Sequence, residues 1–163
     1  MLIGGLGMGF TLRAALAALG ADAHIVVAEL VPAVTEWAQG PMRVVFGECL
    51  TDPRVRIHEA DVGILIKESS ADYDAILLDV DNGPEGLTRK ANDGLYDVDG
   101  LQAARTALRP GGVLAVWSSA PNNAFSRRLR TAGFSLEEVA VRSNGTRGTR
   151  HVIWLATAKR IIV

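Results

Sequence analysis

The sequence contains a single cysteine, Cys49, only three histidines and few aromatic residues. A lone cysteine excludes an internal disulfide, and the scattered histidines lack the spacing of metal ligands, so we expect no metal. No apolar run is long enough to span a bilayer, and no cationic leader precedes an apolar stretch, so we expect a cytoplasmic protein without membrane contact. We expect the three tryptophans to lie in the core or its shell: Trp37, Trp117 and Trp154.

The 163 residues fit one domain, 1–163, and 48% of them are hydrophobic, which suffices for a globular core. The net charge of the chain is −1, but the charge is unevenly distributed. Residues 121–163 contain 8 Lys and Arg and only 2 acidic residues. We interpret these basic residues as a solvated surface. An anion contact near Arg142, Arg147 and Arg150 is the alternative. Nucleic acid is not an expected partner, because no aromatic residues alternate with these arginines.

Apolar β-rich runs alternate with helical patterns along the chain. The expected strands are 1–3, 24–29, 55–59, 75–78 and 113–117, and the expected helices are 10–19, 31–39, 61–69, 97–108 and 122–132. Two further strands, 134–141 and 151–158, are joined by a turn too short for a crossover helix, so they should form an antiparallel hairpin. The order predicts an α/β fold with a three-layer, Rossmann-like sheet, mostly parallel, ending in that hairpin.

Three connecting regions complete this prediction. The first strand is a stub, so either the protein begins abruptly or an upstream segment precedes it. Residues 109–112, Arg-Pro-Gly-Gly, should form a turn before the fifth strand. Residues 80–96 form a long polar loop, and such loops usually line a binding site.

Glycines cluster between the first strand and the first helix, at Gly4, Gly5, Gly7 and Gly9. Glycines at this place let a ligand approach the backbone closely and leave helix amides free to face it. The same cluster can be a tight turn, but its position directly after the first strand favours a nucleotide-type ligand.

Acidic residues stand at the ends of three strands. Glu29 follows the glycines by about twenty residues, where an acid accepts hydrogen bonds from both ribose hydroxyls of a nucleoside. Asp61 follows the third strand and is either a helix N-cap or a partner of the adenine amino group, and the two roles can coexist. Asp79 ends the fourth strand, where an acid can orient or deprotonate an amine or hydroxyl nucleophile. The alternative for Asp79 is a turn-forming acid.

The acceptor of such a reaction should be a small molecule bound by the loop after Asp79. The candidate contacts are Asp81, Asn82, Glu85, Asn92, Asp93 and Tyr96. An amine is one candidate acceptor, and the sequence does not identify it further.

Four segments make the sequence similar to the class I S-adenosylmethionine-dependent methyltransferase superfamily, and within it to the spermidine synthase-like branch. They are residues 3–9, 25–29, 52–61 and 74–79, together with 108–114, which fits the whole superfamily. The step Asp52-Pro53-Arg54-Val55 and the following Asp61 are the most branch-specific part. The resemblance implies S-adenosylmethionine or its decarboxylated form as cofactor, with Glu29 at the ribose, Asp61 at the adenine and Asp79 nearest the nucleophile. It also makes a homodimer a candidate.

Two positions depart from the branch pattern. Gly7 stands where the branch carries an Asp for the amine of the decarboxylated cofactor, and Asn82 stands where it carries an Asp for the diamine. We therefore place methyl transfer ahead of aminopropyl transfer in polyamine biosynthesis, which would need Asp81 or Glu85 as a replacement acid. Ile3 stands where many methyltransferases carry an acid. A non-catalytic nucleoside-binding domain is a further alternative, and a dinucleotide oxidoreductase is a poorer one.

Overall fold

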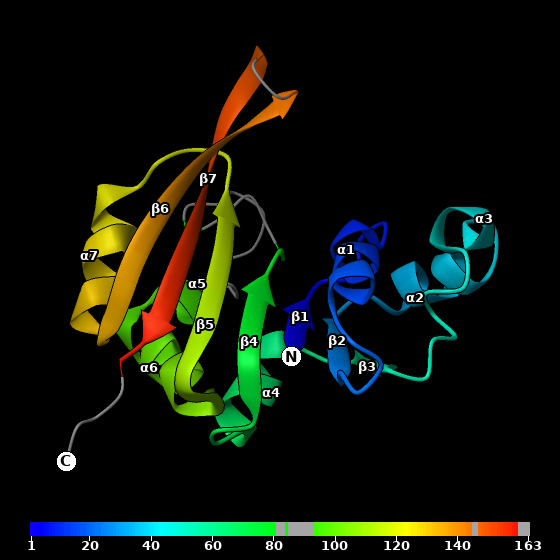
Figure 1. The fold of residues 1–163 in the computed structure, drawn as a ribbon, viewed down its shortest axis with the longest axis horizontal. Coiled ribbons are helices and arrows are strands. Elements are labelled where there is room, and N and C mark those ends of the chain that lie inside the picture. The colour runs from blue at the N-terminus through cyan, green and yellow to red at the C-terminus, as the bar shows by residue number, and fades with distance from the viewer. Residues whose placement is uncertain (81–83, 85–92, 145–146, 160–163) are drawn as a thin grey trace. The chain divides into compact units, whose positions relative to one another are not determined.

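The computed structural model describes residues 1–80, 84, 93–144 and 147–159. The chain forms two compact units, Met1–Leu65 and Ile66–Val163. The division falls within helix α4 (Val62–Glu68). Figure 1 shows the elements of both units, which we describe one after the other.

The first unit is built on three parallel strands. They are β1 (Leu2–Gly4), β2 (Ile25–Glu29) and β3 (Val55–Glu59), with β2 in the middle. Ile3 pairs with Val27, which pairs in turn with Ile57, so all three strands end at the same edge. The connecting helices are α1 (Phe10–Ala18), α2 (Pro32–Gln39) and α3 (Arg43–Phe46).

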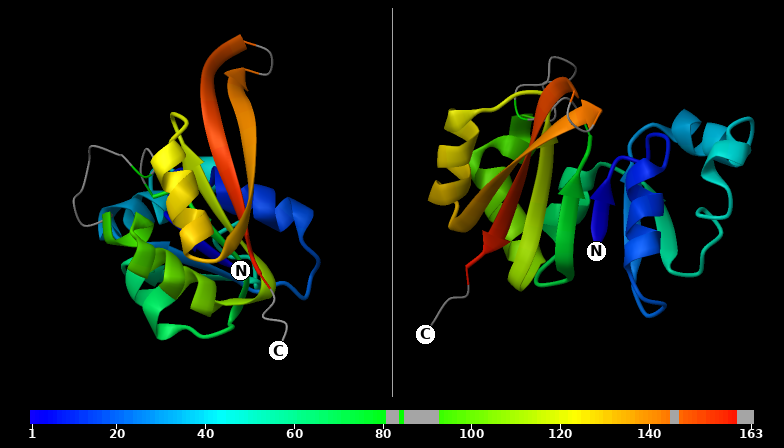
Figure 2. Two further views of the ribbon diagram at one scale, coloured as in Figure 1. Left: turned by 90° about the vertical axis from the view of Figure 1, so that its left-hand side faces the viewer. Right: turned by 45° about the horizontal axis from the view of Figure 1, so that its top comes forward.

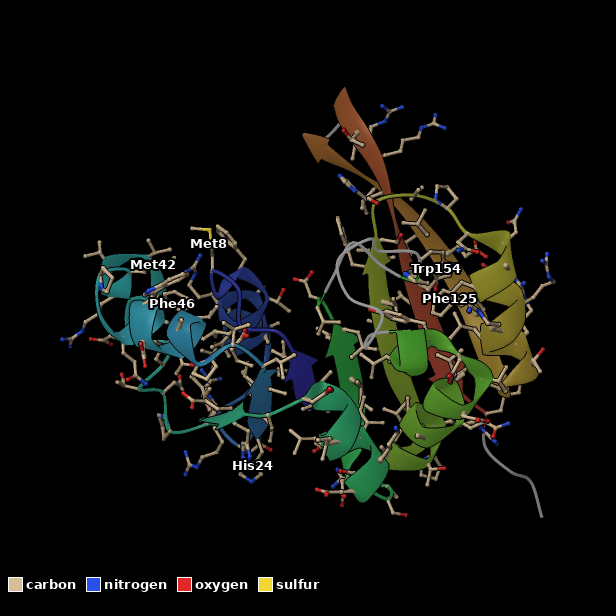
Figure 3. The ribbon with its side chains drawn as sticks, turned by 180° about the vertical axis from the view of Figure 1, so that it is seen from behind. Met8, His24, Met42, Phe46, Phe125 and Trp154 are labelled. Atoms are coloured by element: carbon tan, nitrogen blue, oxygen red, sulfur yellow. The ribbon has the colours of Figure 1, made fainter. Side chains whose placement is uncertain are left out.

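Side chains from strands and helices close the core of the first unit. Ile3, Ile25 and Val27 are at most 1% exposed, and Leu12 of α1 packs in the same cluster. Phe46, from the short helix α3, is also 1% exposed, and Figure 3 labels it with Met42 on this unit. The unit thus buries one continuous apolar cluster.

The second unit carries four strands in the order β4, β5, β7, β6. Their bounds are β4 (Tyr73–Leu78), β5 (Leu108–Ser118), β6 (Phe134–Asn144) and β7 (Arg147–Ala158). β4 and β5 are parallel, and β7 runs antiparallel to both β5 and β6. The β6–β7 hairpin extends beyond the end of β5 (Figures 1 and 2).

Helices pack against one face of these four strands. They are α5 (Asp93–Tyr96), α6 (Val98–Ala107) and α7 (Asn123–Thr131). The fully buried Trp154 packs its ring edge-to-face on Phe125 of α7, with 4.9 Å between the ring centroids. Figure 3 labels both residues. The indole N–H of Trp154 donates to Ser126 Oγ at 3.0 Å, and Ser126 donates to Glu138 at 2.7 Å. This chain of hydrogen bonds satisfies the polar groups that burial of the indole brings into the core.

The predicted α/β class is confirmed: parallel strands alternate with helices, and the chain ends in an antiparallel hairpin. Two side chains cap the helices of the second unit. Asp97 accepts the N–H of Gly100 at 2.7 Å at the start of α6, and Asn122 accepts that of Phe125 at 2.8 Å at the start of α7. Among the residues described, no helix combines the length and apolar character needed to cross a membrane.

Three local predictions are wrong. Residues 109–112 are no separate turn, because β5 runs through them as a bulge in its pairing with β4, with Gly111 at φ 85°. The short helices α3 and α5 were not predicted, since four residues give too little periodicity to detect. Trp37 is 53% exposed on α2 and lies outside the core.

Candidate functional site

The glycine cluster follows β1 as a loop whose backbone only glycine adopts easily. Gly5, Gly7 and Gly9 have φ values of 89°, 49° and 71°. The N–H of Gly5 donates to the carbonyl of Ala28 at 2.8 Å, which fastens the loop to β2. A Cβ built on Gly9 would lie 2.7 Å from the Phe46 ring, whereas one on Gly7 would meet nothing within 4 Å. Gly9 is therefore required by packing, and Gly7 leaves open space beside the loop.

Glu29 holds this loop through its carboxylate. Its Oε2 accepts the N–H of Leu6 at 2.9 Å, and its Oε1 accepts the N–H of Val31 at 2.8 Å. The side chain is 7% exposed, so these bonds compensate the cost of burying a charge. A carboxylate offers about four acceptor sites, and two remain for further donors. A pair of ribose hydroxyls matches that capacity.

Asp61 follows the carboxyl end of β3, which lies beside the end of β2 where Glu29 stands. Its Oδ1 accepts the N–H of Gly63 at 2.7 Å, so the predicted N-cap of α4 is present. The N–H of Ala60 donates to the Glu29 carbonyl at 3.0 Å. The residue just before Asp61 is therefore hydrogen-bonded to the end of β2. In the described part of the chain nothing hydrogen-bonds the second oxygen of Asp61, and that oxygen could accept an adenine amino group.

The branch-specific step at 52–55 has a structural role. Arg54 makes a bidentate pair with Asp52, with Nε–Oδ1 3.0 Å and Nη2–Oδ2 2.9 Å. Its Nη1 also donates to the carbonyls of Leu16 and Leu19, at 3.2 and 2.8 Å. Arg54 thereby caps the carboxyl end of α1, the helix that the glycine loop begins. Residues 52–55 therefore stabilise the helix α1, which the glycine loop precedes.

Asp79 follows β4 directly in the second unit, and its side chain is exposed. Leu78 pairs with Val116 of β5, so Asp79 lies level with Trp117 at the carboxyl ends of the two strands. Ligands of open α/β sheets bind outside these ends. An exposed carboxylate there can reach the proton of a bound nucleophile.

A stacked pair of rings adjoins Asp79, which sequence reasoning missed. Trp117 and His151 stack at 5.1 Å between ring centroids, and both are half-buried. By strand alternation Asp79, Trp117 and His151 point to the same face of the strands of the second unit. No residue described in the structure hydrogen-bonds the buried Nδ1 of His151. The pair became visible only through the pairing of β7 with β5, because 34 positions separate the two residues in the chain.

The predicted acceptor contacts are placed unevenly. Asp81, Asn82, Glu85 and Asn92 lie outside the described residues. Tyr96 is 2% exposed, and its ring meets Phe125 edge-to-face at 5.8 Å. That contact gives the Tyr96 ring a packing role, and a direct acceptor contact stays a prediction.

Cys49 is 8% exposed, and burial raises the pKa of its thiol. A thiol of this kind is a poor nucleophile at neutral pH. Within the described ranges, no three His, Cys, Asp or Glu side chains gather as they would around a metal ion.

Comparison with known proteins identifies several that are similar to this chain. No protein-family model matches it. It is 30% identical over 149 residues to Polyamine aminopropyltransferase 1 of Streptomyces coelicolor. The match includes 86% of this chain and 27% of that protein, so the chain spans about a quarter of the relative's length.

Solved structures resemble the whole chain. A spermidine synthase in complex with the transition-state analogue AdoDATO superposes with a TM-score of 0.74 at 20% identity, covering 96% of this chain and 52% of the other. The chain has the class I methyltransferase fold. A human methyltransferase-like protein 13 in complex with SAH shares this fold with a TM-score of 0.69 at 22% identity, over 94% of this chain and 69% of the other.

The class I methyltransferase fold agrees with the resemblance found in the sequence. The spermidine synthase of Thermotoga maritima also matches, with a TM-score of 0.71 and 52% of its chain covered. A methyltransferase from Pyrococcus furiosus follows with a TM-score of 0.67 at 17% identity. The names of these similar proteins are thus of three kinds: polyamine aminopropyltransferase, spermidine synthase and methyltransferase.

Proposed function

We propose that the chain is the cofactor-binding part of a transferase that uses S-adenosylmethionine and moves its methyl group to a small-molecule acceptor. The observation that carries the proposal is the Glu29 carboxylate, which is buried beside the glycine loop with one backbone donor on each oxygen. Such a carboxylate is fixed in place and still has two acceptor sites for ribose hydroxyls. Asp61 would add the adenine contact through its second oxygen.

The cofactor would supply an electrophilic carbon attached to a sulfonium when bound. The residues of the chain would do the rest. The glycine loop would let the ligand approach the backbone, and Glu29 would orient it. Asp79 would accept the proton that the acceptor amine or hydroxyl loses. The lone pair of the acceptor would form the new bond to carbon as the carbon–sulfur bond breaks, and the sulfur would leave as a neutral thioether. The Trp117–His151 pair would form a wall of the acceptor site.

Gly7 supports methyl transfer over aminopropyl transfer. The loop offers no carboxylate at this position, and no atom of the described residues lies within 4 Å of a Cβ built on Gly7. An acid there would attract the free amine of a decarboxylated cofactor and repel a cofactor carboxylate. A glycine at this position neither attracts the free amine nor repels the cofactor carboxylate. It therefore favours S-adenosylmethionine over the decarboxylated form.

Aminopropyl transfer is the second candidate, and the similarity to a polyamine aminopropyltransferase favours it. This alternative needs an acid for the amine of the cofactor, which Asp81 or Glu85 would have to supply. A nucleoside-binding domain without catalysis is the third.

Calorimetric titration with S-adenosylmethionine, decarboxylated S-adenosylmethionine and methylthioadenosine separates the candidates. Tighter binding of the carboxylated form supports methyl transfer. Tighter binding of the decarboxylated form overturns it in favour of aminopropyl transfer. Binding of all three without turnover of any acceptor supports the non-catalytic alternative.

Substitution of Gly7 tests the reason for that preference. Gly7→Asp should shift the ratio of the two affinities toward the decarboxylated form by tenfold or more. Gly7→Asn is the matched control, because Asn has the same shape, also tolerates a positive φ, and has no charge. An equal shift in both variants would show that the charge at position 7 does not select the cofactor.

A further inference from the structure

A cavity of the second unit lies at the start of β5, at the end of the parallel strands opposite to Asp79. It has a volume of about 390 Å³, within the range of roughly 300–1,000 Å³ that is common for small-molecule sites. Its walls come from the segment before β4, the end of α6, the start of β5 and the end of β7. β5 is eleven residues long, so the cavity is roughly 30 Å from the carboxyl ends of the strands.

Most of the cavity wall is apolar, and its charged side chains are all cations. Ala71, Leu108, Pro110 and Ala158 form the apolar part, and Arg105 and Lys159 line it as well. No carboxylate is among the lining residues that the structure describes. Two like charges that line one cavity repel each other, and an anion between them would relieve that repulsion.

The acidic residues Asp72 and Asp74, which follow the lining residue Ala71 in sequence, hydrogen-bond to groups outside the cavity. Both oxygens of Asp74 accept from Nη1 of Arg109 at 2.9 Å. Asp72 Oδ2 accepts the N–H of Ser70 at 3.1 Å. Within the described residues, neither carboxylate makes an ion pair with Arg105 or Lys159.

Arg105 is held in position by the fold. It projects from the last turn of α6, and a Cβ at Gly133 would come within 3.2 Å of its Cζ and Nε. Gly133 has a φ of 93°, a backbone conformation that favours glycine. The absence of a side chain at this position also leaves room for the guanidinium of Arg105. The Nε of Arg105 is buried, and no described residue accepts its hydrogen.

We propose that this cavity binds a small organic carboxylate, with its oxygens on Arg105 and Lys159 and a short apolar tail against Leu108 and Pro110. A guanidinium fork matches the two oxygens of a carboxylate, and a lysine adds a second charge. The apolar wall selects a ligand that carries hydrocarbon beside its anion. This site is separate from the proposed cofactor site and does not depend on the proposed function.

An NMR titration of the ¹⁵N-labelled chain with sodium hexanoate, acetate and phosphate, all at one ionic strength, tests the site. Hexanoate should shift the amides of residues around the cavity, among them Thr106 and Ala158. It should bind at least tenfold more tightly than acetate, because acetate lacks the tail. Phosphate tests for a bare oxyanion, and binding of phosphate as tight as that of hexanoate would overturn the proposal.

Three variants complete the test. Arg105→Gln and Lys159→Gln should each weaken hexanoate binding at least tenfold. Arg127→Gln removes an exposed arginine on α7 that does not line the cavity, and it should bind like the wild type. Lys159 is exposed, so its variant keeps the test valid if Arg105→Gln fails to fold. Unchanged affinity in Lys159→Gln and in a folded Arg105→Gln would refute the site.

Discussion

The carboxylate of Glu29 accepts the backbone N–H of Leu6 at 2.9 Å, so the residue expected to bind the ribose also fixes the glycine loop. Binding and folding are coupled at this side chain. A loss at Glu29 should therefore affect cofactor affinity and stability together.

Glu29→Gln should lower the free energy of unfolding by about 1–3 kcal/mol, because an amide nitrogen at one of the two positions cannot accept the backbone N–H it would face. Cofactor affinity should fall in parallel, as measured by calorimetry. Glu59→Gln is the matched control, since Glu59 pairs with Glu29 across the strands and is exposed. Equal effects in both variants would argue against a special role of Glu29.

Gly9→Ala should destabilise the first unit more than Gly7→Ala. Both glycines have a positive φ, 71° and 49°, so each substitution should cost about 1–2 kcal/mol for the left-handed backbone. Only Gly9 has the Phe46 ring in the way of a Cβ, which should add about 1–3 kcal/mol of overpacking. Chemical denaturation measures both. Phe46→Leu should partly rescue Gly9→Ala, and strictly additive losses would contradict the contact.

The Asp52–Arg54 pair should make stability depend on pH in the acid range. Hydrogen bonding from the Arg54 side chain lowers the pKa of Asp52 from 3.8 to about 2. A lowered pKa means that the stabilisation is complete above the unfolded value and is lost as the pH falls from about 4 toward 2. Arg54→Gln should flatten the loss of stability in that window, as followed by circular dichroism. Arg56→Gln should keep the wild-type slope, because the Arg56 side chain donates to the backbone carbonyls of Pro53 and Val55.

Asp79→Asn should reduce turnover by about 10²–10⁴-fold if Asp79 is the general base, while cofactor affinity stays unchanged. A radiolabelled cofactor assay and calorimetry measure the two quantities. Asp99→Asn, on the exposed first turn of α6, is the control and should remain active. Undiminished turnover in Asp79→Asn would remove the catalytic assignment.

Cys49 should react slowly with a thiol reagent in the folded chain. Burial raises the pKa of this thiol, so less thiolate is present at pH 8, and the sulfur is also shielded. Denaturant should accelerate the reaction toward that of a free thiol. The chain has one cysteine, so the rate reports on this site alone. Rapid labelling without denaturant would show that the cluster around Cys49 opens readily.

Part of the site could be predicted because it depends on neighbours in the chain. Asp61 was expected as an N-cap and accepts the N–H of Gly63, two residues on. The glycines were expected to form a loop, and their φ values agree. The prediction of a turn at residues 109–112 was wrong, because the same glycines also permit a β-bulge. Only the pairing of β5 with β4 decides between the two.

The sequence by itself determined the order of strands and helices, the C-terminal hairpin and the acids at the strand ends, because apolar periodicity and capping act over a few residues. Tertiary structure alone decided that Glu29 grips the glycine loop, that Arg54 caps α1, and that Trp117 stacks on His151. It also brought Arg105 and Lys159 to one cavity. These contacts join residues that are 23 to 54 positions apart, and strand pairing and helix packing, which no local pattern specifies, bring them together.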